Sequence, residues 1–304
     1  MLKRPEFPTV VDATFLRDAR SCLRKLQLSS FHHYKPVGTN VHLHAGAAFA
    51  QGLEIARRQF YANAASAADA VAMGCLALQE AYGDYTPPEG SAKSRDRMIG
   101  ALVYYFDCWP LDTGEAKPAE GPLGPMVEFS FQEPLPIHHP VTGDPLIYSG
   151  RADMICTLGG GAEHYIEDDK TASSLGATWS QQWDLRSQFT GYCWAYRQIF
   201  QRPPAGVLVR GVSILKTKYD HAQAITYRPE WQIDRWLAQT MRDLDRVIQA
   251  WESGYWDYNL DESCSQYGGC TFRQVCLQKD PEPWLAMQFE QRRWDPVART
   301  ETKL

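Results

Sequence analysis

The sequence predicts an α/β fold with an antiparallel hairpin at its centre, and three observations lead to this prediction. Residues 42–109 consist mainly of stretches typical of helices. Residues 126–173 contain three segments in which apolar and polar residues alternate, as they do in half-buried strands. One helix, two further strands and a long helix follow, so the order of elements is helices, a small sheet interrupted by one helix, and then helix.

The N-terminal part is predicted to be helical. Residues 12–30 show an amphipathic pattern after an aspartate that can cap a helix. Residues 42–66 are rich in Ala, Leu and Glu, residues 67–83 continue as a second helix, and residues 94–109 form a third. The next stretch, residues 111–125, is rich in Pro and Gly and is predicted to be a loop.

The strands come next, over residues 126–137, 144–158 and 162–173. The last two are joined by "LGGGAE", residues 158–163, whose glycines suit a tight connection. These two strands are therefore expected to pair as an antiparallel hairpin.

The C-terminal part is predicted to begin with a helix over residues 179–200 and strands over residues 202–217 and 222–229. A long helix over residues 229–254 has a proline at its start and a glycine at its end. The remaining tail contains three cysteines and a charged stretch that is expected to be loose.

Length and composition limit the class of protein. The chain has 304 residues, 44% of them hydrophobic, which is enough for one large domain or two with a sizeable core. The net charge is −5 and the pI is about 5.9, which argues against a surface coated with basic residues for bulk nucleic-acid binding. A local basic groove beside an acidic metal site remains compatible with this average.

No run of eighteen apolar residues is present and the first residues lack an apolar signal-peptide core, so neither a membrane span nor a signal peptide is expected. The expected location is the cytoplasm, which would be the host cytoplasm for a phage protein. In that reducing compartment the eight cysteines are expected to be core residues, metal ligands or catalytic thiols rather than disulfides.

The third strand ends in a cluster of charged residues. Asp168 and Lys170 are two apart on a strand and therefore point to the same face, whereas Asp169 points to the other. If the glycines form the turn, Asp153 lies opposite residue 167 or 168. This cluster is either a solvated strand end or half of a metal site.

Two carboxylates beside a lysine meet the needs of phosphodiester hydrolysis. That reaction requires a divalent ion held by oxygen ligands, an activated water and a positive charge against the charge that grows on the phosphate. Asp153, Asp168 and the backbone carbonyl of Asp169 are the candidate ligands, and Lys170 is the candidate for positioning the water or stabilising the transition state. Gln188 and Tyr192, four apart on one helix face, are candidates for holding a DNA backbone or orienting Lys170.

These residues together resemble the PD-(D/E)XK nuclease superfamily, in its RecB-type exonuclease branch. The family pattern is an Asp on one strand, Asp or Glu-x-Lys on the next, and Gln-x-x-x-Tyr on the following helix. Asp153, Asp168-x-Lys170 and Gln188-x-x-x-Tyr192 match it in order. The resemblance implies a restriction-endonuclease-like core, a small mixed sheet flanked by helices, within residues 121–228. An N-terminal helical region over residues 1–120 and a C-terminal helix with a cysteine-rich segment over residues 229–304 would flank this core.

The family also has an upstream helical element, usually a Gly followed by a His and then a Glu. Gly46 and Glu54 fit this element, and the resemblance makes Glu54 a candidate metal ligand. The alternative is that Glu54 is a polar position on an amphipathic helix. Ala50 stands where the His is expected, and this departure argues against a second metal ion and against a preference for manganese.

The cysteines extend the resemblance to RecB-type nucleases that hold an iron–sulfur cluster with one cysteine before the nuclease motifs and three after. Here those positions are Cys22, Cys264, Cys270 and Cys276. Four thiolates suit a [4Fe–4S] cluster. Zinc is the alternative metal, although the even spacing of the last three cysteines lacks the short pairs usual in zinc sites.

The resemblance thus implies a DNA exonuclease that uses Mg²⁺ or Mn²⁺ and acts on DNA ends or single strands in recombination, repair or phage DNA metabolism. Lys216 and Lys218 close a predicted strand and are candidates for lining a DNA path. The alternatives are an endonuclease of the same superfamily and a catalytically decayed DNA-binding protein. Association into a homo-oligomer, or with recombination or CRISPR-type proteins, is left open.

Overall fold

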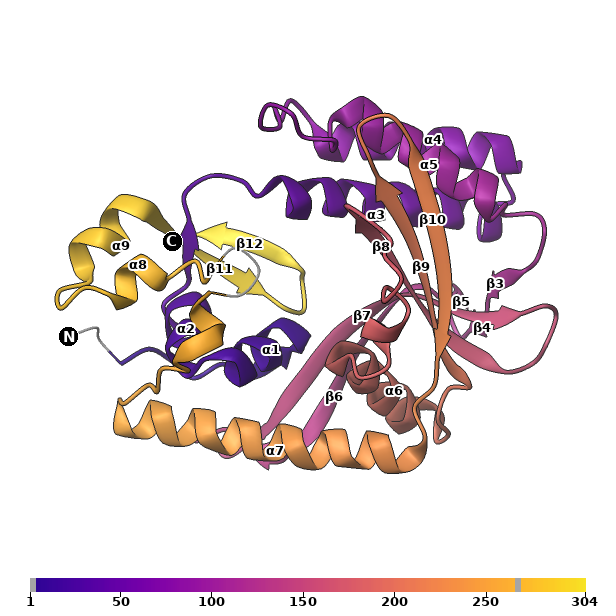
Figure 1. Ribbon diagram of the computed structural model, residues 1–304. Helices are drawn as coiled ribbons and strands as arrows, with labels where there is room; N and C mark the ends of the chain where they lie inside the picture. The colour runs from indigo at the N-terminus through magenta and orange to yellow at the C-terminus, as the bar shows by residue number, and fades with distance from the viewer. Residues whose placement is uncertain (1–3, 266–268) are drawn as a thin grey trace. The chain divides into compact units, whose positions relative to one another are not determined.

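The computed structural model describes residues 4–265 and 269–304. Within these ranges the largest sheet has seven strands, in the order β1-β7-β8-β9-β10, with β3 and β6 also pairing with β7 (Figure 1). The mixture of helices and one mixed sheet agrees with the predicted α/β class. The strands are β1 (Val10–Asp12), β3 (Ala116–Pro118), β6 (Val127–His138), β7 (Pro145–Leu158), β8 (His164–Ala172), β9 (Gly206–Ile214) and β10 (Tyr219–Thr226).

The chain divides into two compact units, each made of separate segments. Unit 1 comprises Met1–Gly38, Phe131–Gly150 and Trp231–Leu304, and unit 2 comprises Thr39–Ser130 and Arg151–Glu230. The chain passes from one unit to the other within β6 and again within β7. The division of the sequence into three consecutive parts stays a prediction.

Unit 2 contains the predicted hairpin. β7 and β8 are antiparallel, with Met154 opposite Glu167, and Gly159 and Gly160 form the connection with positive φ angles of 56° and 76°. Glycine adopts this left-handed conformation without the steric penalty that a Cβ would bring. β8 then pairs in parallel with β9, which pairs antiparallel with β10.

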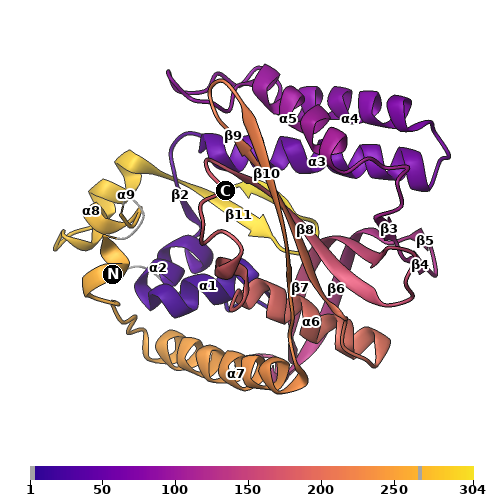
Figure 2. The same ribbon diagram turned by 45° about the vertical axis from the view of Figure 1, so that its right-hand side comes forward.

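Helices α3 (Val41–Tyr61), α4 (Ala67–Tyr82) and α5 (Arg95–Cys108) lie together beside the sheet of unit 2 (Figure 2). Their apolar residues share one buried cluster with Val212 and Ile214 of β9. Gly52 and Gly74 let α3 and α4 approach closely, because a Cβ on Gly74 would lie 2.6 Å from the carbonyl oxygen of Gly52. These three helices confirm the predicted ones.

The predicted helix over residues 179–200 is shorter in the structure. A 3₁₀ turn at Gln181–Trp183 is followed by α6 (Ser187–Phe200). Trp179 packs directly over Gly211 of β9, where a Cβ would lie 2.4 Å from its ring. The indole packs on the strand and holds the segment before α6 against the sheet. The helix therefore begins only at Ser187.

In unit 1 the predicted helix over residues 12–30 is interrupted. Asp12 caps α1 (Ala13–Ser21) as expected, but Cys22 is extended, and α2 (Leu23–Leu26) and a π-helical turn (Gln27–Phe31) follow. α1 is tied to the long helix α7 (Glu230–Ser253) by Arg20, whose Nε lies 2.6 Å from Asp243 Oδ2. The bounds of α7 confirm the predicted helix over residues 229–254.

The expectation of a loose C-terminal end is wrong. A 3₁₀ turn (Asp261–Cys264), α8 (Arg273–Cys276) and α9 (Glu282–Gln288) lead into β11 (Phe289–Asp295), which pairs with both β12 (Thr300–Lys303) and β2 (Tyr34–Pro36). Opposite charges on facing strands, such as Arg292 and Glu301, pair across this small sheet.

The Pro- and Gly-rich stretch 111–125 contains short strands as well as turns, namely β3 and the pair β4 (Glu120–Gly121) and β5 (Gly124–Pro125). Over the part of the chain that the structure describes, no helix has the length and apolar character needed to cross a membrane.

Candidate active site

The β7–β8 hairpin brings Asp153 and Asp168 together. Met154 pairs with Glu167, so the same antiparallel register, continued by one position, places Asp153 opposite Asp168 and on the same face. The backbone N–H of Asp169 donates to Asp153 Oδ2 at 2.7 Å. The register agrees with the sequence prediction, and the catalytic and metal-binding roles of these residues stay predictions.

The carboxylates of this site repel one another. Asp168 is only 2% exposed and forms an ion pair with Lys170. Burial and the charge of Asp168 raise the pKa of Asp153 well above its usual value. Burial alone would lower the pKa of Lys170, but Asp168 and Asp153 more than offset it and raise that pKa. The lysine is therefore held as a cation beside two carboxylates.

Helix α6 closes the same face of the hairpin. Gln188 Nε2 donates to the hydroxyl of Tyr192 at 2.9 Å, so the two residues predicted to share a helix face do so. Burial, together with the charge of Asp168, raises the pKa of Tyr192 to about 12. The ammonium of Lys170 also lies 6.0 Å from the ring centre of Phe189 on this helix.

Glu128 on β6 is a site residue that the sequence analysis missed. Its side chain is only 5% exposed and its Oε2 lies 2.6 Å from Arg151 Nε. Its charge contributes to the raised pKa of Asp153, after burial and the nearer charges of Asp168 and Asp169. Glu128 has a φ of +56°, a left-handed conformation that costs of order 1 kcal/mol for a residue with a Cβ. A buried carboxylate in a strained backbone position close to Asp153 makes Glu128 a further candidate site residue.

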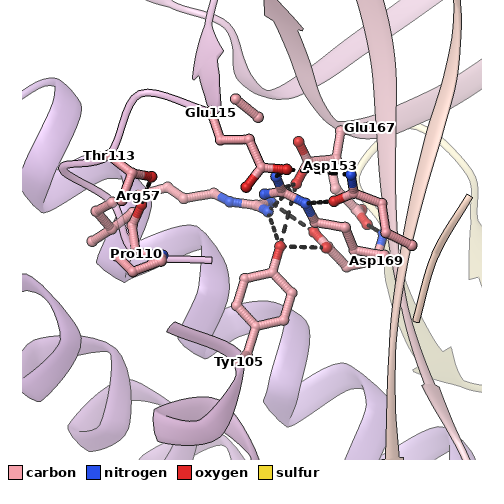
Figure 3. A network of polar contacts seen from close by, with 12 residues as sticks. Arg57, Tyr105, Pro110, Thr113, Glu115, Asp153, Glu167 and Asp169 are labelled. Carbon is pink, nitrogen blue, oxygen red and sulfur yellow. Dashed lines mark hydrogen bonds and ion pairs between the residues drawn. The ribbon is translucent and has the colours of Figure 1, made fainter. Parts of the chain in front are cut away.

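The opposite face of β8 carries a buried ionic network (Figure 3). Arg57 of α3 lies 2.5 Å from Glu167 Oε1 and 2.7 Å from Asp169 Oδ2, and its side chain is 4% exposed. The hydroxyl of Tyr105 donates to Asp169 at 2.8 Å, and Arg210 lies 3.5 Å from Glu167. Burial would lower the pKa of Arg57, but Asp169 and the other acids raise it, so the guanidinium stays charged.

This network holds β8 on the face opposite the candidate catalytic residues. Because side chains alternate along a strand, Glu167 and Asp169 face α3, whereas Asp168 and Lys170 face α6. The arginine thus holds the strand whose other face carries the candidate catalytic residues. No sequence pattern revealed this pairing.

Glu54 contacts Arg58 rather than the carboxylates of the hairpin. Arg58 Nε lies 2.9 Å from Glu54 Oε1, one turn further along α3. Its role as a metal ligand stays a prediction. Nearby, His44 is held by the carbonyl oxygen of Tyr82 at 2.9 Å, a structural contact.

Across the described ranges, no three His, Cys, Asp or Glu side chains are already gathered as a metal site. The oxygen-rich donor set nevertheless suits a hard divalent cation, because Asp153 and Asp168 are buried close enough to raise the pKa of Asp153. A divalent ion would relieve this repulsion and compete with Lys170 for Asp168.

The order of these elements matches a known family. The family model described as the PD-(D/E)XK nuclease superfamily matches residues 14–277. The chain belongs to the PD-(D/E)XK nuclease superfamily. It is therefore a hydrolytic nuclease by family, as the resemblance implied.

Other comparisons are weaker. A solved structure from Eubacterium rectale, provisionally described as an exonuclease, is 10% identical, with a TM-score of 0.49, 85% of this chain and 88% of that chain covered. The structure named SSO0001 is 13% identical, with a TM-score of 0.32 and coverage of 88% and 96%. Both TM-scores lie below 0.5, so neither similarity bears on function. No curated protein matches the chain significantly.

The four cysteines predicted to bind a cluster in this PD-(D/E)XK nuclease all lie in unit 1. Cys22 Sγ accepts from the backbone N–H of Asn259 at 3.4 Å, and Cys264 Sγ lies 3.9 Å from the carbonyl oxygen of Asn259. Burial raises the pKa of the Cys276 thiol, and Cys270, Cys22 and Cys264 add to this shift. Residues 266–268 of the connecting segment lie outside the described ranges, and the binding of a cluster by these thiols stays a prediction.

Proposed function

We propose that this nuclease is a metal-dependent exonuclease of the RecB type that hydrolyses DNA at ends or on single strands. The observation that carries the proposal is the hairpin on which Asp153, Asp168 and Lys170 share one face, with Gln188 and Tyr192 beside them. This arrangement supplies oxygen ligands, a cation paired with Asp168 and hydrogen-bonding groups at one place. The order of these motifs is that of RecB-type exonucleases.

The residues that would hold Mg²⁺ or Mn²⁺ are Asp153, Asp168 and the backbone carbonyl of Asp169, with Glu128 as a further carboxylate beside Asp153. When bound, such an ion supplies Lewis-acid polarisation of the phosphodiester and activation of water. The backbone N–H of Asp169 donates to Oδ2 of Asp153, so the hairpin backbone fixes the orientation of this carboxylate.

Lys170 supplies positive charge where negative charge develops on the phosphate. Its ammonium forms an ion pair with the buried Asp168, so the charge is held in place before substrate arrives. Gln188 and Tyr192, which are hydrogen-bonded to each other, are the candidates for contacting the phosphate or orienting the lysine. The loss of the upstream His to Ala50 favours a single metal ion.

The proposal is tested with end-labelled single-stranded and double-stranded DNA and with a closed single-stranded circle. We expect linear DNA to be degraded from its ends with Mg²⁺ or Mn²⁺, no degradation with EDTA, and an intact circle, because an exonuclease requires an end. A cut circle would establish the endonuclease alternative. Binding without cleavage in either metal would instead favour a decayed catalytic core that still binds DNA.

We also propose that Cys22, Cys264, Cys270 and Cys276 hold a [4Fe–4S] cluster. The support is chemical: all four cysteines are free thiols, and four thiolates are the usual ligand number for such a cluster. The cluster would join the segment around α2 to the segment around α8, both within unit 1. Zinc, which also accepts four thiolates, is the alternative.

Anaerobically purified protein is expected to be brown and to contain about four iron atoms per chain. Cys276→Ser should abolish the colour and the bound iron. Cys75→Ser is the matched control, because Cys75 is also partly buried but packs in the core of unit 2. Colourless protein with one zinc per chain would contradict the iron–sulfur proposal and leave the nuclease proposal intact.

A further inference from the structure

Unit 2 contains a cavity of about 430 Å³ at the carboxyl ends of β8 and β9. Its lining combines the first turn of α3, the segment between α4 and α5, and the residues that follow the two strands. The charged and hydroxyl-bearing residues of the lining are His42, Glu89, Ser91, Lys93, Ser173 and Lys216.

Lys93 is the unusual member of this lining. The residue is only 4% exposed, and its Nζ donates to Thr171 Oγ1 at 3.3 Å. Burial lowers the pKa of Lys93, and no neighbouring carboxylate in the described ranges offsets this shift. Among the residues that the structure describes, no ion pair involves this ammonium. A buried ammonium without a counter-ion is costly unless an anion joins it.

The segment that carries Lys93 is held rigidly. The hydroxyl of Tyr82 donates to the carbonyl oxygen of Lys93 at 2.6 Å, and the backbone N–H of Lys93 donates to Ser91 Oγ at 3.2 Å. These bonds fix the backbone of Lys93, and the burial of the side chain against Thr171 positions its ammonium. A fixed donor loses less conformational entropy when it binds an anion.

A second lysine faces the same cavity. Lys216, which follows β9, has its Nζ 3.6 Å from where a Cβ on Gly90 would lie. Gly90 has a φ of +77°, a conformation that suits glycine, so the backbone there can pass beneath the lysine. Glu89 is the acidic member of the lining and is exposed. The cavity thus presents two cations and hydroxyl groups to an incoming ligand.

The cavity lies at the end of β8, the strand that carries Lys170. Thr171, the partner of Lys93, follows Lys170 on β8, and Ser173 lines the cavity just beyond the end of that strand. Three residues of strand from Lys170 to Ser173 span about 10 Å. A ligand in the cavity would therefore lie close to the candidate site, around the end of β8.

We propose that this cavity binds a phosphate group of the nucleic-acid strand, with Lys93 and Lys216 as its charged ligands. The inference rests on the proposed nuclease function and adds a substrate-binding position to it. The phosphate is either a terminal phosphomonoester or an internal phosphodiester next to the one that is cleaved. The shared chemistry, an anionic phosphate oxygen between two ammonium groups, is the same in both cases.

The test measures binding without cleavage, in EDTA, by fluorescence anisotropy of labelled single-stranded DNA. Four strands of one sequence are compared: with a 5′-phosphate, with a 3′-phosphate, with hydroxyl ends, and as a closed circle. Lys93→Met and Lys216→Ala should each weaken binding by about tenfold, since each removes a charged hydrogen-bond donor. The dependence of log K on log salt should become flatter by about 0.7 for each lost contact.

Lys117→Ala is the matched control, because Lys117 is exposed on β3 of the same unit and does not line the cavity. Lys93→Met should leave thermal stability unchanged or raise it, since it removes a buried charge that lacks an ion pair in the described structure. Weakening only for strands with one kind of phosphate end identifies a terminal phosphate, and equal weakening for all four strands identifies an internal one.

Binding equal to that of the unaltered protein in both lysine variants would overturn the proposal, as would failure of the unaltered protein to bind any of the strands. Binding is measured without a metal ion and therefore does not depend on cleavage. If both lysine variants bind DNA more weakly as expected but the unaltered protein does not cleave DNA, the result counts against the hydrolytic function alone. If the unaltered protein cleaves DNA and both lysine variants bind DNA as tightly as it does, the result counts against the phosphate-binding cavity alone.

Discussion

Replacing Lys170 with alanine is expected to reduce DNA cleavage by at least about 10²–10³-fold, the usual cost of removing a fixed charge or donor that stabilises a transition state. Lys170 forms an ion pair with the buried Asp168 on the face of the hairpin that carries the candidate site. Without it the phosphate would gain negative charge beside two carboxylates and no compensating ammonium. The measurement is the initial rate of release of labelled nucleotides at saturating Mg²⁺.

Two companion variants separate catalysis from folding. Lys170→Met keeps most of the side-chain volume and should lose activity to the same degree, whereas the exposed Lys117→Ala should not. Thermal unfolding of each variant shows whether the hairpin survives. Magnesium-dependent cleavage by Lys170→Ala at the unaltered rate would show that this lysine takes no part in the chemistry.

Arg57→Ala is expected to destabilise the protein by about 3–5 kcal/mol, the range typical of breaking a buried ion pair by removing one partner. Arg57 compensates both Glu167 and Asp169, whose side chains are 0% and 3% exposed. Its loss leaves Asp169 with the hydroxyl of Tyr105, and Glu167 with a guanidinium 3.5 Å away on Arg210. The free energy of unfolding is measured by urea denaturation.

The neighbouring arginine provides the control. Arg58 is 44% exposed and forms an i,i+4 pair with Glu54, so Arg58→Ala should cost at most about 1 kcal/mol. Both substitutions shorten the same residue type on the same helix, so helix propensity cancels in the comparison. Equal losses for the two variants would show that the network behind β8 does not stabilise the fold.

The hairpin of the candidate site could be predicted from sequence because its geometry is local. Alternation along a strand separates Asp168 and Lys170 from Asp169, and the glycines that close the turn fix the register that places Asp153 opposite Asp168. The spacing of Gln188 and Tyr192 likewise predicts a shared helix face, and the structure joins them by a hydrogen bond. Each of these relations depends on neighbours within a strand, a turn or a helix.

Sequence-based expectations failed where packing outweighs local preference. The helix pattern of residues 12–30 continues through Cys22, yet the backbone there is extended. The charged tail lacks an apolar stripe, but its strand β11 pairs with β2, whose residues lie more than 250 positions earlier. Such long-range pairing stabilises a polar segment that local patterning marks as loose.

By itself the sequence determined the class of fold, the hairpin and the identity of the charges that it carries. Only the tertiary structure decided that Arg57 lies behind the strand, that Glu128 joins Asp153 in spite of a strained backbone, and that Lys93 is buried beside Thr171. The physical reason is that charge pairing depends on which side chains meet after helices pack on a sheet. Arg57 and Glu167 are 110 residues apart, and no periodicity links them.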